Sequence, residues 1–162
     1  MKKWWICLCF VIFLTGCAAE ETFETVGDIL DQPVMAPAAQ IVLELPESAS
    51  TQTGTGEGNR LYFCDGYTVT VQTMDRGDLE RTARSLCGFG TESLKIVQTL
   101  DGDKKRWDWV WTAAGEGGDA VGRAAVIDDG NYHYCVTAMA GAEAAGELEQ
   151  QWTKLFRSFR ID

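Results

Sequence analysis

Three cysteines and the single histidine are the residues beyond the N-terminal segment that could bind a metal, form a disulfide or act as nucleophiles. They are Cys64, Cys87, Cys135 and His133. A Cys₃His zinc site usually places two ligands a few residues apart on a tight turn, and the chain has no Cys-x-x-Cys motif. His133 and Cys135 would share one face of a strand, which gives zinc only weak support. We therefore predict no metal site.

The thiols allow two other interpretations. Cys64 and Cys135 each fall in an expected strand and could form a disulfide if the domain is exported to an oxidising compartment. Because the number of thiols is odd, one would then remain free. Alternatively, all three cysteines are small buried apolar residues. Both interpretations stay open, and the second is favoured.

A cysteine nucleophile paired with His133 fits the sequence poorly. Cys87 would be the last residue of a helix that ends at Gly88, where the negative end of the helix dipole raises a thiol pKa. Ser85 and Ser93 lie in no Gly-x-Ser-x-Gly turn. We therefore predict no catalytic residues and a protein that is not an enzyme.

Three tryptophans, Trp107, Trp109 and Trp111, alternate along one expected strand and so project from a single face. If that face is exposed, the indoles form a binding platform for sugars or for a protein partner. If it faces the C-terminal helix, they form a core together with Trp152. The buried arrangement is favoured because the opposite face carries Asp108, Val110 and Thr112.

Composition limits the classes of function. The 162 residues suit one domain with a tail, and 46% hydrophobic residues are enough for a core. The formal net charge of −10 argues against binding nucleic acid, which needs clustered Lys and Arg. It also argues against electrostatic adhesion to anionic lipid.

The N-terminus has the proportions of an export signal. Lys2 and Lys3 precede an apolar run from Trp4 to Leu14. A membrane-spanning helix needs ~20 apolar residues, so the run is too short to be one. We predict a signal peptide over residues 1–16.

Leu14-Thr15-Gly16-Cys17 resembles the lipobox of bacterial lipoproteins. The resemblance implies cleavage between Gly16 and Cys17 and a diacylglyceryl thioether on the Cys17 sulfur, with no other cofactor. Two acyl chains anchor a protein stably, because each buried methylene contributes ~0.8 kcal/mol. The expected location is the outer face of a bacterial cell membrane. An ordinary signal peptide or a short uncleaved anchor are the alternatives.

Residues 17–40 are acidic and lack apolar periodicity, so we predict a flexible lipidated tether. The folded domain is expected over residues 41–162. Ile41 to Leu45 alternate as a first strand closed by Pro46, and the Gly/Ser/Thr-rich residues 47–59 predict a mobile loop.

The rest of the chain predicts an α+β domain with an antiparallel sheet of about five to six strands, one short helix and one longer C-terminal helix. Short turns rich in Asp and Gly join successive strands, which must therefore be antiparallel neighbours. The expected strands span residues 61–64, 67–74, 94–100, 104–113, 119–127 and 132–140. The helices are expected over 79–87, between Asp78 and Gly88, and over 142–156, with a short extended tail at 159–161.

This element order resembles the fold shared by the photosystem protein PsbP and the Ran-binding Mog proteins. There an early strand ends near a proline, an antiparallel meander follows, and a terminal helix crosses the sheet. The resemblance covers about residues 41 to 159 and carries over no functional residue. It implies a binding or assembly module.

The leading hypothesis is therefore a membrane-anchored surface lipoprotein that binds a protein or envelope partner without catalysis. The alternative is a cell-envelope hydrolase or a sugar- or ligand-capture protein that uses the face of Trp107, Trp109 and Trp111. Buried or exposed indoles distinguish the two.

Overall fold

A computed structural model describes residues 36–52, 58–115 and 118–162. The expected signal peptide, the expected lipidation site Cys17 and most of the expected tether lie outside the described residues. No helix in these three ranges is long and apolar enough to cross a bilayer.

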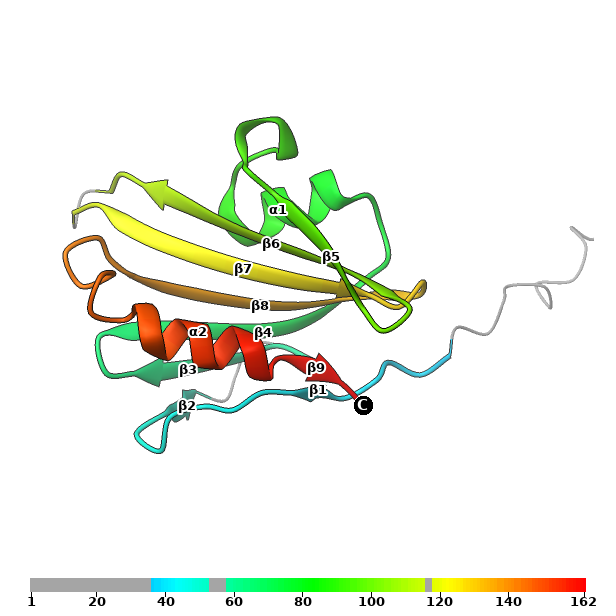
Figure 1. Ribbon diagram of the computed structural model, residues 1–162, viewed down its shortest axis with the longest axis horizontal. Coiled ribbons are helices and arrows are strands. Elements are labelled where there is room, and N and C mark those ends of the chain that lie inside the picture. Colours follow the sequence, from blue (N-terminus) through cyan, green and yellow to red (C-terminus); the bar gives the residue numbers. More distant parts are fainter. Residues whose placement is uncertain (1–35, 53–57, 116–117) are drawn as a thin grey trace, which may run out of the picture. The chain divides into compact units, whose positions relative to one another are not determined.

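The described residues form an α+β domain with nine strands, two α-helices and a short 3₁₀ turn (Figure 1). The strands are β1 (Ile41–Val42), β2 (Ser50–Gln52), β3 (Arg60–Cys64), β4 (Tyr67–Asp75), β5 (Val97–Asp101), β6 (Lys104–Ala113), β7 (Ala120–Asp128), β8 (Tyr132–Gly141) and β9 (Arg160–Ile161). Seven of them make one antiparallel sheet in the order β2-β3-β4-β8-β7-β6-β5. The predicted fold class is confirmed, with more strands than expected.

Short turns make the hairpins, as predicted. Gly66 between β3 and β4, Gly102 between β5 and β6, and Gly130 between β7 and β8 all have positive φ, which glycine adopts without strain. Each turn returns the chain beside the strand it has just left, so the paired strands are antiparallel. The pairing of β4 with β8 is different, because it joins strands that are distant in sequence.

The two segments that flank the main sheet differ from expectation. β1 does not join that sheet but pairs with β9, with Ile41 opposite Ile161, so the predicted extended tail is a strand. The backbone N–H of Ala39 also donates to the Tyr134 hydroxyl over 2.8 Å. Residues 39–42, including the end of the expected flexible tether, are therefore bound to the domain.

The expected mobile loop over 47–59 contains β2, which pairs with β3 at one edge of the sheet. Ser50 lies opposite Phe63 and Gln52 opposite Leu61. Polar composition did not prevent this strand because an edge strand satisfies its backbone groups on one side only and keeps its side chains in solvent. Residues 53–57 of that segment lie outside the described part of the chain.

The first helix, α1 (Leu79–Cys87), has the predicted bounds. The Asp78 carboxylate accepts the backbone N–H of Arg81 over 2.7 Å, and Gly88 ends the helix with a φ of 80°. The second helix, α2 (Glu149–Ser158), is shorter than the expected 142–156, because residues before Leu148 form turns. Gly146 interrupts that stretch, and glycine disfavours helix.

A hydrophobic core lies on each face of the sheet. Under α2, residues of β4, β7 and β8 pack against Trp152, Leu155, Phe156 and Phe159. Under α1, the three tryptophans of β6 pack against Ala83 and Cys135. Figure 1 shows the two helices on different sides of the sheet.

The tryptophans of β6 are buried, as favoured, but they pack under α1 instead of the C-terminal helix. Trp107, Trp109 and Trp111 are 9%, 2% and 6% exposed, whereas Trp152 belongs to the core on the other face. The face of β6 that is turned toward α2 carries Arg106, whose guanidinium donates to a backbone carbonyl of that helix. Alternation then directs all three indoles away from α2.

Candidate binding site

The chemically capable side chains predicted from the sequence are distributed over both faces of the sheet. His133 and Cys135 share the α1 face of β8, as expected, and both are buried. Cys87 contacts the same core from α1, whereas Cys64 packs in the core under α2. The sheet therefore separates Cys64 from the other two cysteines and from His133.

The suggested disulfide between Cys64 and Cys135 is not formed, and all three described cysteines are free thiols. Cys64 lies opposite Tyr67 on β4, whereas Cys135 lies opposite Gln72 on the same strand. The two cysteines thus occupy different positions along β4 and opposite faces of the sheet. A disulfide needs Cα atoms within about 7 Å, so the backbone keeps these thiols apart.

Burial also limits the reactivity of the thiols. Desolvation raises the pKa of Cys135 to about 12 and raises the pKa of Cys64 as well. Because the thiolate is the nucleophilic form, Cys135 is inert at neutral pH. The Cys87 thiol donates to the backbone carbonyl of Ala83 over 3.1 Å.

His133 is part of the core beneath α1. Its Nδ1 lies 2.7 Å from the Thr82 hydroxyl, and its ring meets the Trp107 ring edge-on at a centroid distance of 5.7 Å. Burial lowers its pKa, and the Arg76 and Arg81 guanidiniums add to this effect against the opposing charge of Asp128. The ring is 1% exposed, so His133 is a packed core histidine.

This burial predicts a pH dependence of stability. Because the pKa of His133 is lowered on folding, the unfolded chain binds more protons than the folded chain below the usual value of about 6.5. The free energy of unfolding should therefore fall as the pH drops from about 7 to about 5. Urea unfolding at both pH values measures it. His133 is the only histidine, so His133→Gln should flatten the dependence over this range, and an unchanged slope would contradict the assignment.

The indole platform that the alternative hypothesis required is absent from the described surface, because the three β6 tryptophans are covered. Gly122 of β7 makes this packing feasible. A Cβ on Gly122 would lie 2.2 Å from the Trp111 ring, so only glycine lets that ring lie against β7. The residues proposed as a binding face are core residues.

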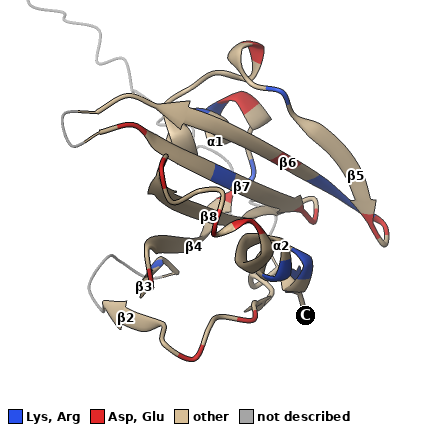
Figure 2. Cartoon of the chain, turned by 60° about the vertical axis from the view of Figure 1, so that its left-hand side comes forward, with Lys and Arg blue, Asp and Glu red and all other residues tan. Residues whose placement is uncertain are grey.

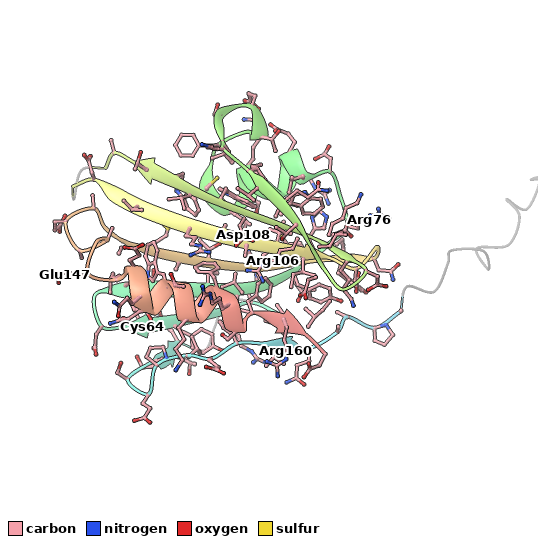
Figure 3. The ribbon with its side chains drawn as sticks, in the orientation of Figure 1. Cys64, Arg76, Arg106, Asp108, Glu147 and Arg160 are labelled. Atoms are coloured by element: carbon pink, nitrogen blue, oxygen red, sulfur yellow. The ribbon has the colours of Figure 1, made fainter. Side chains whose placement is uncertain are left out.

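Accessible polar chemistry lies on the other face of β6, in a groove of about 600 Å³ between α2 and the strands β5, β6 and β7. We call it the arginine groove. It is lined by Val97, Arg106, Asp108, Arg123, Thr153, Phe156 and Arg157. Figure 2 shows basic positions on β6, β7 and α2, and Figure 3 shows Arg106 and Asp108 close together near α2.

Arg106 lines the groove and donates four hydrogen bonds. Its Nε and Nη2 donate to the two Asp108 oxygens over 2.8 and 3.2 Å. Its Nη2 and Nη1 also donate to the carbonyls of Phe156 and Phe159 over 2.8 and 3.2 Å. A guanidinium at these carbonyls satisfies the end of α2 and opposes the negative end of its dipole. Arg106 is therefore a structural contact between sheet and helix.

Arg123 is placed beside this pair and is much less engaged. Its guanidinium lies over the Phe156 ring at 4.4 Å from the centroid, and Nη2 is 3.6 Å from Asp108. Among the described residues it donates no hydrogen bond. Stacking on an aromatic ring holds a guanidinium flat while its N–H groups stay available at the edge.

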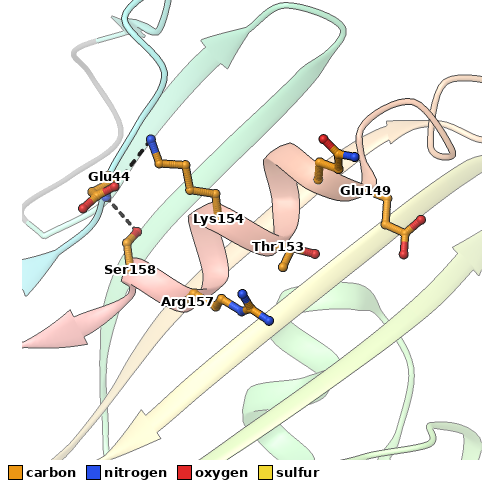
Figure 4. Close-up of a pocket in the computed structure, with 7 residues that line it drawn as sticks. Glu44, Glu149, Thr153, Lys154, Arg157 and Ser158 are labelled. Carbon is orange, nitrogen blue, oxygen red and sulfur yellow. Dashed lines mark hydrogen bonds and ion pairs between the residues drawn. The ribbon is translucent and has the colours of Figure 1, made fainter.

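Arg157 enters the groove from α2, and no described residue forms an ion pair or hydrogen bond with its side chain. Figure 4 shows that its side chain extends in a different direction from that of Lys154. Lys154 instead lies 3.7 Å from Glu44, whose backbone N–H donates to Ser158 over 2.9 Å. Both basic residues of this helix border the pocket drawn in Figure 4, but only Arg157 also lines the arginine groove.

A second cavity of about 740 Å³ lies between residues 38–45 and the strands β2, β3 and β4. It is bordered by Gly58 and Asn59, which adjoin the segment 53–57 outside the description. Its walls are mixed apolar and polar, and Arg60 is the only charged residue among those that line it. It therefore presents fewer charged groups to a ligand than the arginine groove does.

Sequence reasoning missed the arginine groove. Arg106 lies under α2, where its guanidinium donates to the Phe156 carbonyl. The alternation that set Asp108 opposite the tryptophans was a usable signal for the polar face of β6. Arg123 and Arg157 carried no such signal, because they lie in different elements and meet only through tertiary packing.

No protein-family model matches the chain, and no curated protein matches it. Among solved structures, a Bacteroides thetaiotaomicron protein aligns with a TM-score of 0.51 and 13% identity, over 75% of this chain. The chain spans only 45% of that protein. A likeness at this identity concerns the fold alone.

Two further structures align with TM-scores of 0.49. The Saccharomyces cerevisiae Ran-binding protein Mog1p is 13% identical over 75% of this chain and 89% of its own. LpqN, involved in cell envelope biogenesis of Mycobacterium tuberculosis, is 12% identical over 76% of this chain and 84% of its own.

Proposed function

We propose that this protein is a lipid-anchored lipoprotein of the bacterial cell envelope whose α+β domain binds a protein or envelope partner without catalysing a reaction. The motif Leu14-Thr15-Gly16-Cys17 after a basic and apolar leader is the observation that carries the proposal. Diacylation of Cys17 would supply two acyl chains, which suffice for stable anchoring. The membrane is thus the first partner.

The chemistry of the domain supports a binding role. Cys135 and His133 are covered by α1, and the Cys135 thiol is held protonated by burial. In the arginine groove, guanidiniums lie beside one carboxylate and remain partly accessible. Such a set recognises a ligand by charge and hydrogen bonding.

The anchor is tested by Cys17→Ser in the bacterial cell. This change removes the sulfur that would carry the diacylglyceryl group, so we expect loss of labelling by a fatty-acid probe and loss of the protein from the membrane fraction. Cys64→Ser is the matched control, because it removes a free thiol of the folded domain and should leave both readouts unchanged. The mature wild-type chain should begin at Cys17. A Cys17→Ser protein that is still labelled and still sediments with membranes would refute the anchor.

A further inference from the structure

The arginine groove concentrates positive charge in an acidic protein. Three arginines and one aspartate line it, which gives a formal charge of +2 in a chain of net charge −10. The residues come from β6, β7 and α2, and the partial burial of Arg106, Asp108 and Arg123 strengthens their field relative to freely solvated side chains. An anion is therefore the ligand that this groove attracts.

The hydrogen-bond donors in the groove are divided between used and unused. Arg106 donates hydrogen bonds to Asp108 and to two backbone carbonyls at the C-terminal end of α2. Arg123 and Arg157 donate to no described residue, and Arg123 is held in place by the Phe156 ring. The unused donors of two guanidiniums match the paired oxygens of a carboxylate or phosphate.

Exposed apolar side chains lie beside these donors. Val97 of β5 lines the groove, and Val110 of β6 lies on the same face of the sheet outside the groove lining; the two side chains are 54% and 55% exposed. Val97 lies opposite Asp108, and Val110 lies opposite Arg123. An apolar group joined to the bound anion would rest on these two valines and remove them from water.

We propose that the arginine groove binds a small ligand in which an oxyanion, carboxylate or phosphate, is joined to an apolar body. Arg123 and Arg157 hold the oxyanion, Phe156 and Asp108 keep Arg123 in place, and Val97 and Val110 receive the apolar part. This inference rests on the proposed function, in that it names the class of ligand bound by the anchored domain.

Calorimetric titration of the full-length anchored protein in phosphatidylcholine nanodiscs tests the inference. Benzoate and phenyl phosphate serve as probes, empty nanodiscs as the blank, and benzamide as the uncharged analogue of benzoate. We expect saturable binding of at least one anion and none of benzamide. Arg123→Gln and Arg157→Gln should each weaken that binding about tenfold or more, the effect of losing one charge-assisted hydrogen bond.

Lys154→Gln is the matched control. It removes the same charge from the same helix, but its side chain lies 3.7 Å from Glu44 and is not among those that line the arginine groove. Binding should therefore be unchanged within about twofold. Arg123→Lys keeps the charge but loses the planar pair of donors, so its binding should be intermediate.

Three results would overturn the inference: no saturable binding of either anion, binding that survives both arginine substitutions, or an equal loss in Lys154→Gln, which would indicate diffuse attraction. Arg157 is exposed, so Arg157→Gln should fold normally and keep the test valid. The membrane fractionation of Cys17→Ser does not depend on this groove. Failure of the ligand class and failure of the lipid anchor are therefore separate outcomes.

Discussion

Trp109→Ala is expected to lower the free energy of unfolding by about 3–5 kcal/mol, the usual cost of emptying a buried aromatic site. Trp109 is 2% exposed and is the middle indole of the core between β6 and α1. The other fully buried members of this core, Ala83, Ala124, Val126 and Cys135, are small, so they cannot fill the space. The cavity would also remove the surface on which α1 packs.

Urea unfolding followed by far-ultraviolet circular dichroism measures this loss. Val110→Ala is the matched control on the same strand, because its side chain is 55% exposed on the opposite face and should change stability by less than about 0.5 kcal/mol. Trp109→Phe should cost much less than alanine, since the indole N–H has no described partner. Equal effects of Trp109→Ala and Val110→Ala would contradict the buried position of the indole.

Arg106→Gln is expected to lower the free energy of unfolding by about 2 kcal/mol. The substitution removes the donors to Phe156 and Phe159 at the end of α2 and both hydrogen bonds to Asp108. The Arg106 and Asp108 side chains are 15% and 22% exposed, so solvent compensates only in part. Arg123 remains 3.6 Å from Asp108, so the Asp108 carboxylate keeps one cationic neighbour and the loss of stability is smaller.

The same unfolding measurement, together with amide hydrogen exchange over 156–161, tests this role. Exchange should accelerate at the C-terminal end of α2 and in β9. These segments adjoin Phe156 and Phe159, whose carbonyls lose the Arg106 donors. Lys105→Gln is the control, because Lys105 is exposed and its side chain belongs to the other face of β6. If the two substitutions behaved alike, Arg106 would not be the contact that holds the helix end.

Local sequence determined the hairpins and the first helix. Asp65-Gly66 requires a tight turn, and strands joined by such a turn have no geometry available except antiparallel pairing. Asp78 and Gly88 define both ends of α1 through one side-chain hydrogen bond and one positive φ. These are interactions between residues close in sequence, so propensity and turn chemistry were sufficient.

The edges of the domain were less predictable. β2 has no apolar alternation and forms only because β3 presents free backbone groups beside it. β1 pairs with β9, near the other end of the chain, although Ile41 to Leu45 alternate like a strand of the main sheet. Neither partner can be identified from the residues of the strand itself.

By itself, the sequence determined that this chain forms hairpins with a capped helix, and that one face of β6 is aromatic while the other is polar. Only the tertiary structure decided which helix covers each face, because that depends on the path of the chain between β4 and β5 and on the long-range pairing of β4 with β8. The arginine groove follows from that decision. Arg106, Arg123 and Arg157 belong to three elements and form one surface only after α2 has packed across the sheet.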